Sequence, residues 1–424
     1  MFLVFIVIFC LFLLFPILTT PFLLFPIMYR FKYSRYYLWL FVLGISLIAL
    51  RYIPNFTDDA AFHYKAAYIY HYYDNIFEWF GNLMTKKIPT EYGYHNYPLF
   101  ALLLFLFSKT GTYSLISFTV CIIVYYMYTS IVHDIYSKYK ISKFLFLFAL
   151  ITMVAIVNVR YTTSGMRYSL SVAITVFLFY REIENEFKLN KFLLWYVIPI
   201  LIHSSAVIFV FIRILFPWLK NTNFYKKIMV LCILPLLMIL SPVLQYLNIN
   251  YLSFLLDKFS IYRDTQTFIG LFRNSDLIYV YVGVLICIIY ILFYHFVFRL
   301  QQQSKFKNFY SFVLYICLIT ISVLPFLTIL DRFVWFVYPL AIISLVLHVT
   351  EDKSDLRKVR YRKNKFFMCY LVLFLCLLGG VIGNKKFLDF LYFVDFDTIK
   401  ILTSNVFEYF SDLHHFSLSE VRRR

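Results

Sequence analysis

Apolar runs recur along the chain, many of them about twenty residues long, and they constrain the fold more than any other feature of the sequence. A helix needs about 20 mostly apolar residues to cross the hydrocarbon core of a bilayer. Hydrophobic residues make up 62% of the 424 positions and charged residues 15%, whereas soluble proteins carry about 45–50% and about 25%. This composition argues against a soluble enzyme. An outer-membrane barrel is also excluded, because barrel strands alternate polar and apolar residues and residues 144–156 do not.

We therefore expect an all-α, polytopic integral membrane protein with about 10–12 transmembrane helices, short half-membrane helices and an outward-facing interfacial helix. Residues 1–384 form a single membrane domain and residues 385–424 a C-terminal tail. The candidate spans are 2–28, 37–53, 113–133, 143–159, 162–181, 192–216, 227–247, 276–298, 308–330, 332–349 and 366–384. Residues 97–107 are too few to cross, so we expect a half-membrane piece that dips from the outer face.

Lys and Arg cluster in the short connections between the runs, and these clusters predict the orientation. The positive-inside rule assigns the most basic connections to the cytoplasm. These connections are 30–35, 138–143, 181–191 and 350–365. The polar inserts 54–96 and 248–275 then face outward. The net charge of +18 is explained by this topology and by contact of the basic residues with anionic lipid headgroups. We therefore expect no nucleic-acid partner.

Residues 192–216 create a conflict in this topology. A single crossing would place the Lys220–Lys227 cluster outside and would invert every later loop. The conflict disappears if the segment enters the membrane and returns on the same side, with its turn at the polar cluster that begins with His203. A re-entrant backbone is tolerated only where protein buries it or where it lines a water-filled cavity. Either the later loops violate the charge rule, or His203 lies at the floor of a cavity; we expect the second.

Two arginines, Arg160 and Arg167, lie near the junction of two candidate spans at the outer face. On a continuous helix, seven residues bring them to the same face two turns apart. Each guanidinium can donate a bidentate fork to phosphate oxygens, so the pair suits a diphosphate. The alternative is that both side chains snorkel to the lipid headgroups.

Acidic and aromatic residues gather in the insert 54–96. Asp58 and Asp59 open a segment in which Asp59 and His63 are four residues apart and share a helical face. The many aromatic residues from Ala60 to Phe80 predict a helix in the outer interface, where such rings settle, and aromatic faces also stack on sugars.

The sequence contains no nucleotide-binding loop, no H-E-x-x-H motif and no paired cysteines at metal-ligand spacing, so we expect no cofactor and no metal. Asp331 and Arg332 lie between two candidate spans with only two residues for the turn. We expect them at the outer interface, as a local salt bridge or as part of a site.

The order of these motifs resembles the EpsG-like branch of the Wzy polysaccharide polymerases, over roughly residues 1–349. The matching features are Arg51 after the second span, an Asp followed by Tyr64, Glu91-x-Gly-Tyr94 before a short helix, Ser-Gly-Met-Arg167 opening a span, Ile202-His203-Ser-Ser-Ala in the next, and Arg332 after a late span. Where the family usually has Gly before the first Asp, this chain has Asp58-Asp59, and the tail has no counterpart.

The resemblance implies a glycosyltransferase that polymerises undecaprenyl-diphosphate-linked repeat units into O-antigen, capsule or exopolysaccharide at the outer face of the bacterial inner membrane. No cofactor is implied, and a flippase and chain-length regulators are expected partners besides membrane lipids. The candidate bases are Asp58, Asp59, Glu91 and His203. The candidate substrate-binding residues are Arg51, Arg160, Arg167, Arg332, Tyr64 and Tyr94.

Two other functions remain open from the sequence. A flippase or exporter of lipid-linked oligosaccharide would also use arginines and aromatic rings in a cavity, but it would need no general base. A membrane glycosyltransferase that uses a polyprenyl-phosphate sugar usually has acidic residues in its first outer loop, as Asp58 and Asp59 are here.

Overall fold

The computed structural model describes residues 2–52, 54, 58–88, 93–139, 141–157, 159–185, 192–219, 223, 227–230, 232, 278–296, 304–324, 326–350, 359–389 and 403–411. Within these residues the secondary structure is helical and contains no strand. Five of the helices are long and apolar enough to cross a membrane. They cover Ser34–Arg51, Ser114–Tyr139, Ile278–His295, Ile329–Thr350 and Phe366–Asn384. The expected all-α, polytopic membrane protein is confirmed.

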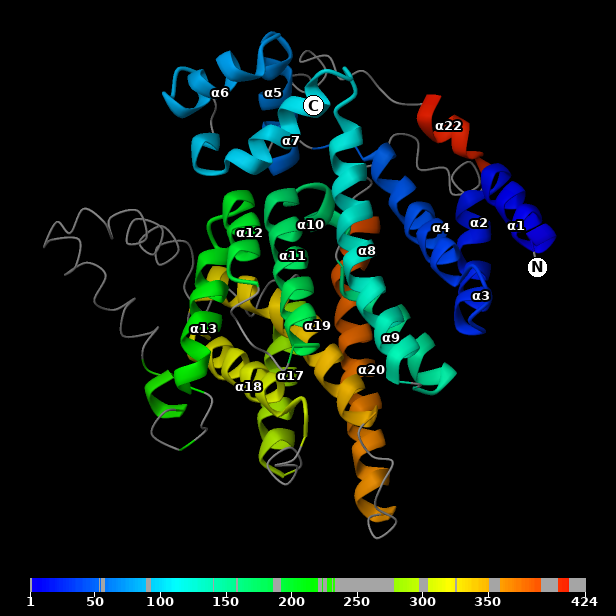
Figure 1. The fold of residues 1–424 in the computed structure, drawn as a ribbon, viewed down its shortest axis with the longest axis vertical. Helices are drawn as coiled ribbons and strands as arrows, with labels where there is room; N and C mark the ends of the chain where they lie inside the picture. The colour runs from blue at the N-terminus through cyan, green and yellow to red at the C-terminus, as the bar shows by residue number, and fades with distance from the viewer. Residues whose placement is uncertain are drawn as a thin grey trace, which may run out of the picture.

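The helices follow one another as a bundle and a small cap (Figure 1). The first half comprises α1 (Phe2–Leu14), α2 (Pro16–Thr19), η1 (Thr20–Leu23), α3 (Leu24–Met28), α4 (Ser34–Ser46), η2 (Leu47–Arg51), α5 (Asp59–His71), α6 (Ile76–Met84), η3 (Tyr94–Asn96), α7 (Pro98–Ser108), α8 (Ser114–Tyr139) and α9 (Lys143–Ile156). The rest comprises α10 (Val159–Thr163), α11 (Met166–Ile183), η5 (Leu194–Tyr196), α12 (Val197–Ile202), α13 (Ala206–Leu219), α17 (Ile278–Phe296), α18 (Lys307–Ser322), α19 (Leu327–Thr350), α20 (Val359–Asp389) and α22 (Val406–Ser411).

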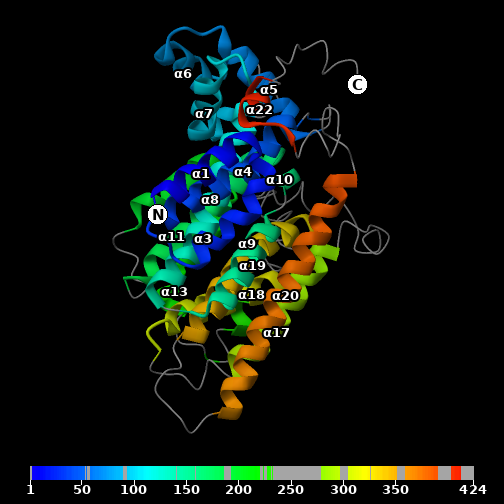
Figure 2. The same cartoon turned by 90° about the vertical axis from the view of Figure 1, so that its right-hand side faces the viewer.

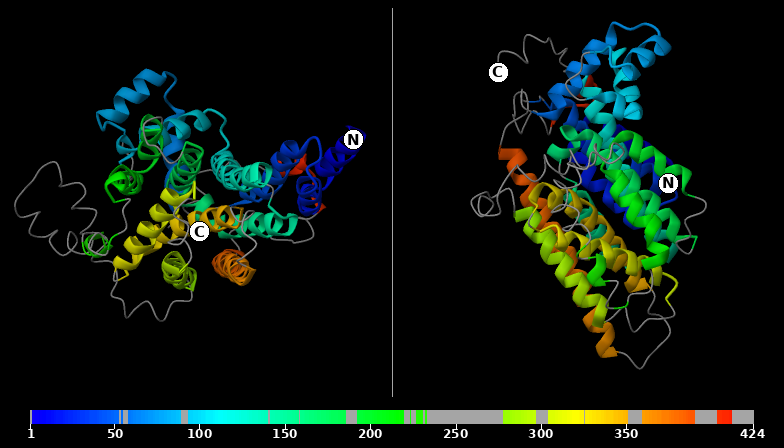
Figure 3. Two further views of the ribbon diagram at one scale, coloured as in Figure 1. Left: turned by 60° about the horizontal axis from the view of Figure 1, so that its bottom comes forward. Right: turned by 90° about the vertical axis from the view of Figure 1, so that its left-hand side faces the viewer.

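The centre of the bundle is α19, which packs against α17, α18, α20, α8, α9 and α11. In the apolar stretch of α19 that could cross a membrane, 89% of the residues are buried, whereas in that of α20 only 33% are. Helix α20 therefore faces outward over much of its surface. Helices α17 and α20 run side by side (Figure 2), and α1–α4 lie at one edge of the bundle (Figure 3). Both α19 and α20 are apolar around most of their circumference, which suits burial or contact with lipid equally.

Basic residues gather at one end of the bundle, which we call the basic end. The Arg30 guanidinium donates to the Tyr136 carbonyl near the end of α8. The other contacts at this end are Lys143 over the Tyr29 ring, Lys138 with Glu184, and Lys305 over the Tyr139 ring. They bring the connections before α4, after α8, after α11 and before α18 together, as a common cytoplasmic side requires.

Helices α5, α6 and α7 form a cap over the opposite end, the cap end (Figures 1 and 2). The described part of the insert 54–96 therefore lies away from the basic end, as the predicted topology requires. The aromatic stretch is two helices, not one, because the chain turns at residues 72–75 and Asn75 caps α6 by accepting a hydrogen bond from the Phe77 amide. Helix α7 packs on α5 and on α12.

Residues 192–219 form a hairpin whose turn is at His203. The backbone of His203 is extended (φ −154°, ψ 125°), which ends α12 before α13 begins. One carboxylate, that of Glu182, accepts hydrogen bonds from Tyr196 before the turn and from Arg213 after it. Farther along, Lys227 contacts His295, at the end of α17. The predicted break is confirmed, and both limbs lead to the basic end, as a return to the same side requires. Of the three lysines in the Lys220–Lys227 cluster, only Lys227 lies among the described residues.

The predicted single span 2–28 is wrong, because the chain reverses at Phe15. Phe15 is held out of the helical region (φ −138°, ψ 69°) by the proline that follows it. The ring of Phe5 contacts Tyr36 near the start of α4, and Phe12 and Thr20 both reach Gly44 near its end. A Cβ at Gly44 would lie 1.8 Å from Thr20 Oγ1, so only glycine permits this close packing.

The expected position of Asp331 and Arg332 in a two-residue turn is also wrong. Both lie inside α19, and the chain turns earlier, between the end of α18 at Ser322 and the start of α19 at Leu327. Hydropathy alone does not locate this turn, because apolar residues flank Asp331 and Arg332 on both sides. The insert 248–275 and the basic residues 351–358 lie outside the described residues.

The topology predicts opposite labelling of the two ends. Cysteine in place of the exposed Glu78 of α6 should react with a membrane-impermeant maleimide on intact cells. Cysteine in place of Lys305, at the basic end, should react only after the membrane is opened. The unsubstituted chain, with its seven native cysteines, gives the background signal. Labelling of both positions from the same side would contradict the topology.

Candidate functional site

Four segments meet beneath the cap: the loop before α7, the start of α11, the hairpin tip at 203–205 and the start of α19. Their contacts place the predicted residues Tyr94, Arg167, His203 and Arg332 in one neighbourhood. Each of these segments lies at or near a helix end, and the turns between helices bring these ends to the same level of the bundle.

Arg167 lies in the first turn of α11 and is 8% exposed. Its guanidinium carbon lies 4.7 Å from the centre of the Tyr97 ring and 5.7 Å from that of Tyr94. Aromatic faces attract a cation while leaving its in-plane N–H groups able to donate elsewhere. The N-terminus of a helix also carries partial positive charge. Both features favour an anionic ligand at this place.

His203 packs between two tyrosines. Its ring stacks on Tyr97 at 5.7 Å and meets Tyr168 edge-on at 5.5 Å. Its Nδ1 lies 3.2 Å from the backbone nitrogen of Ser205 and 2.6 Å from the Ser205 hydroxyl. Because a backbone N–H can only donate, Nδ1 is the accepting nitrogen, and the neutral ring carries its proton on Nε2. His203 therefore presents a hydrogen-bond donor.

Arg332 joins the same neighbourhood through Tyr168. Its guanidinium carbon lies 4.3 Å from the centre of the Tyr168 ring, and the Tyr168 hydroxyl donates to the Arg332 carbonyl. Tyr168 directly follows Arg167 in α11, so Arg332 lies over the residue next to Arg167. Arg332 is half-buried.

His63 lies within the cap, on α5, and is fully buried, with Nδ1 2.6 Å from the Tyr94 hydroxyl. Burial, and then the positive charge of Arg167 and the nearby His203, lower the pKa of His63 well below its usual value near 6.5. His63 is therefore neutral at physiological pH. Its partner Tyr94 also faces Arg167, which connects the cap to the arginine.

Of the three predicted carboxylates, Asp58 has the best-defined surroundings. It is buried before the start of α5 and accepts a 2.8 Å hydrogen bond from the Tyr52 hydroxyl. Burial, and then the nearby Asp58 charge, raise the pKa of Tyr52, while a hydrogen bond with Ser164 opposes the shift. Ser164 is three residues before Arg167, so its hydrogen bond brings Tyr52 next to the segment that carries the arginine. Asp59 is half-buried in the first turn of α5, where a carboxylate is favoured by the helix dipole.

Two of the predicted residues lie wholly or partly outside the described residues. Glu91 is one of them, and for Arg160 only the backbone, in α10, is described. Tyr64 is buried against α8, where its hydroxyl lies 2.7 Å from that of Ser117. This position makes Tyr64 a packing residue between the cap and the bundle.

The tail contacts Arg51, which no sequence signal indicated. One guanidinium nitrogen of Arg51 donates to the Ser404 hydroxyl over 2.8 Å, and the Tyr409 ring lies 4.3 Å from its carbon. The ring of Phe410 meets Phe118 of α8. The part of the tail that the structure describes is thus packed against the cap end.

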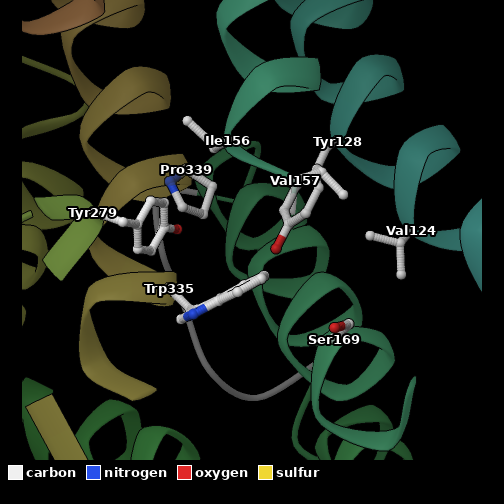
Figure 4. A pocket seen from close by; sticks show the side chains of 8 residues that line it. All are labelled: Val124, Tyr128, Ile156, Val157, Ser169, Tyr279, Trp335 and Pro339. Carbon is white, nitrogen blue, oxygen red and sulfur yellow. The ribbon is translucent and has the colours of Figure 1, made fainter. Parts of the chain in front are cut away.

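A small pocket lies deeper in the bundle, between α8, α11, α17 and α19 (Figure 4). It is lined by Val124, Tyr128, Ile156, Val157, Ser169, Tyr279, Trp335 and Pro339. The space is about that of a single water molecule, so it admits no sugar. Trp335 also contacts Tyr168, so the pocket lies directly below the arginine neighbourhood. Among the described residues, no three His, Cys, Asp or Glu side chains gather as a metal site.

Comparisons of the chain with protein-family models, with curated proteins and with solved structures give no match. The resemblance to the polysaccharide polymerases therefore rests on the ordered motifs of the sequence alone.

Sequence reasoning missed the tyrosines that hold the site together. Tyr97 and Tyr168 each contact both an arginine and His203. The available signal was position: Tyr97 directly precedes the short helix α7, and Tyr168 directly follows Arg167. Among 38 tyrosines, this signal was too weak to select them.

Neutral, buried His63 predicts an acid-sensitive fold. Below pH 6.5 the unfolded chain binds a proton at His63 that the folded chain does not, so stability falls as pH falls, by up to about 1.4 kcal/mol per pH unit. His63→Gln keeps a hydrogen-bonding group toward Tyr94 but does not titrate. Thermal unfolding in detergent from pH 7.5 to 5 should therefore show a smaller loss for the variant. Equal losses would contradict a depressed pKa at His63.

Proposed function

We propose that this multi-pass membrane protein polymerises polyprenyl-diphosphate-linked oligosaccharide repeat units into a surface polysaccharide at the outer face of a bacterial inner membrane. The observation that carries the proposal is the meeting of Arg167 and Arg332, each on a tyrosine ring, with His203 at the end of the bundle opposite the basic loops. The ordered motifs of the sequence support the same function.

The reaction needs few groups. A hydroxyl of the incoming lipid-linked unit attacks the anomeric carbon of the growing chain, forming a new C–O bond. The bond between that carbon and the diphosphate oxygen breaks, and the oxygen keeps the electron pair. A base takes the hydroxyl proton. Because charge develops on the diphosphate, preorganised donors around it lower the barrier.

The described side chains suggest roles in this reaction. Arg167 and Arg332 bind the diphosphate with their guanidinium forks. His203 donates from Nε2 to an oxygen of the substrate. Its accepting nitrogen, Nδ1, is bonded to Ser205, so it is poorly placed to take the hydroxyl proton. The carboxylate of Asp58, accepting from Tyr52, is the better base among the described candidates. Aromatic faces of the cap stack on sugar rings.

Cell phenotype separates this function from a flippase. Deletion of a polymerase should leave lipid carrying a single repeat unit at the surface, whereas deletion of a flippase should leave no unit outside. We expect single-unit product when the protein is absent, read on a gel as a single-unit band without the polymer ladder. Complete loss of surface product would favour the flippase, and an intact ladder lacking one sugar would favour a glycosyltransferase that uses a polyprenyl-phosphate sugar.

Arg167 gives the sharpest test of the chemistry. Arg167→Ala should reduce the rate by about 10²–10³-fold, or ~3–4 kcal/mol, as expected for loss of one preorganised donor. Arg167→Lys should also fail largely, because an ammonium keeps the charge but loses the bidentate geometry. The measurement is polymer length in cells at matched membrane levels of protein.

The matched control is Arg181→Ala, on the same helix but at the basic end. It should leave polymer length unchanged. If both Arg167 variants make full-length polymer, Arg167 is removed from the site and the proposed mechanism fails. Free replacement by Lys alone would instead support contact with lipid headgroups.

A further inference from the structure

An ion pair lies inside the bundle, apart from the site. Glu182 and Arg213 are both 0% exposed, and Arg213 Nε lies 2.5 Å from the Glu182 carboxylate. The other carboxylate oxygen accepts a 2.7 Å hydrogen bond from the Tyr196 hydroxyl. We call Glu182, Tyr196 and Arg213 the clasp.

The clasp ties three segments together. Glu182 lies on α11, Tyr196 at the base of the ascending limb of the hairpin, and Arg213 on the descending limb. Ionised side chains within a membrane bundle are costly and are retained where they have a function or a partner. Apolar side chains would fill the same space at a similar or lower free energy. Stability alone therefore does not account for the clasp.

The hairpin needs such a tie. Its ascending helix α12 has six residues, and its tip at 203–205 is not helical. So short a helix has little stability of its own. One further hydrogen bond, from the Ser171 hydroxyl to the Pro199 carbonyl, joins α12 to α11 nearer the tip. The clasp fixes the limbs at the other end.

Helix α11 connects the clasp to the site. It carries Glu182 near its C-terminus and Arg167 in its first turn, fifteen residues away, or roughly 22 Å along the axis at 1.5 Å per residue. The register of the limbs against Glu182 therefore sets where the tip lies relative to Arg167. In that register His203 reaches Tyr168, and the Ser204 hydroxyl lies 3.5 Å from that of Tyr97.

We infer that the clasp positions the hairpin tip, holding His203 and Ser204 against Tyr97 and Tyr168 so that the site is complete. The consequence for catalysis rests on the proposed polymerase function. The clasp residues touch no substrate; they are positioning residues that act through His203 and Ser204.

The test measures the position of the tip and the activity separately. Cysteines in place of Tyr97 and Ser204 are bridged with a short bifunctional thiol reagent in membranes, with each single-cysteine chain as background. This pair is compared in the native clasp and in a Glu182→Leu/Arg213→Met clasp. The double replacement removes both charges together, so no buried charge is left unpaired and folding should be kept. Thermal unfolding in detergent verifies this. Polymer length is measured in chains without the Tyr97 and Ser204 replacements.

The inference predicts that the double replacement loses most of the Tyr97–Ser204 cross-link while its unfolding temperature stays near that of the native chain. Polymer formation should fall by about a hundredfold, as displacement of a site by about 1 Å can cause. The single replacement Arg213→Lys keeps the charge beside Glu182. It should therefore retain part of the cross-link and part of the polymer that the double replacement loses. The control Tyr290→Phe, which removes a buried hydrogen bond to Ser344 between α17 and α19, should change neither.

A folded double variant with normal cross-linking would overturn the inference. Loss of the cross-link with full-length polymer would keep the positioning role but contradict the part of the tip in the proposed reaction, so the two failures are distinguishable. If the double variant does not fold, Tyr196→Phe replaces it. That change removes only the hydrogen bond between the ascending limb and Glu182. Unchanged cross-linking in the Tyr196→Phe chain would equally overturn the inference.

Discussion

The hydrocarbon core of a bilayer offers no hydrogen-bond partners, and this constraint governs where the chain can depart from a helix. Irregular backbone is tolerated at that depth only where protein covers it. The turn at His203 meets the condition, because Tyr97 and Tyr168 lie against it. The break at Phe15 lies at the cap end of the N-terminal hairpin, where α1 approaches α22.

Charged side chains inside the protein also need partners, and here aromatic rings provide many of these contacts. Arg30, Arg51, Arg167 and Arg332 each lie over a tyrosine ring. A ring face partly compensates a cation without neutralising it or occupying all its donors. The aromatic content of 22% therefore has a use beyond anchoring the helices at the interface. It partly compensates the charge of arginines that lie within the protein.

The two ends of the bundle carry different kinds of charged side chains. The basic end carries exposed Lys–Glu and Lys–aromatic contacts typical of a topology signal. The cap end carries buried arginines, a neutral histidine and a buried carboxylate bonded to tyrosine. Helix α11 spans the distance between them, with Arg167 at one end and Glu182 near the other, so the hairpin limbs are bonded to the same helix that carries Arg167.

The sequence by itself determined the all-α membrane class, the separation of the basic loops from the cap and the re-entrant turn at His203. These depend on hydropathy and on charge counting, which are local properties of the chain. It also indicated Arg167 and His203, which are conspicuous as polar residues in apolar runs, and the resemblance to the polymerases added Tyr94 and Arg332. Only the tertiary structure decided that the N-terminal run is a hairpin, that Asp331 and Arg332 lie inside α19, that the tail reaches Arg51, and that Glu182 joins Tyr196 and Arg213. Each of these depends on which residues distant in the chain pack together, and in a sequence so uniformly apolar and aromatic the local pattern does not distinguish one partner from another.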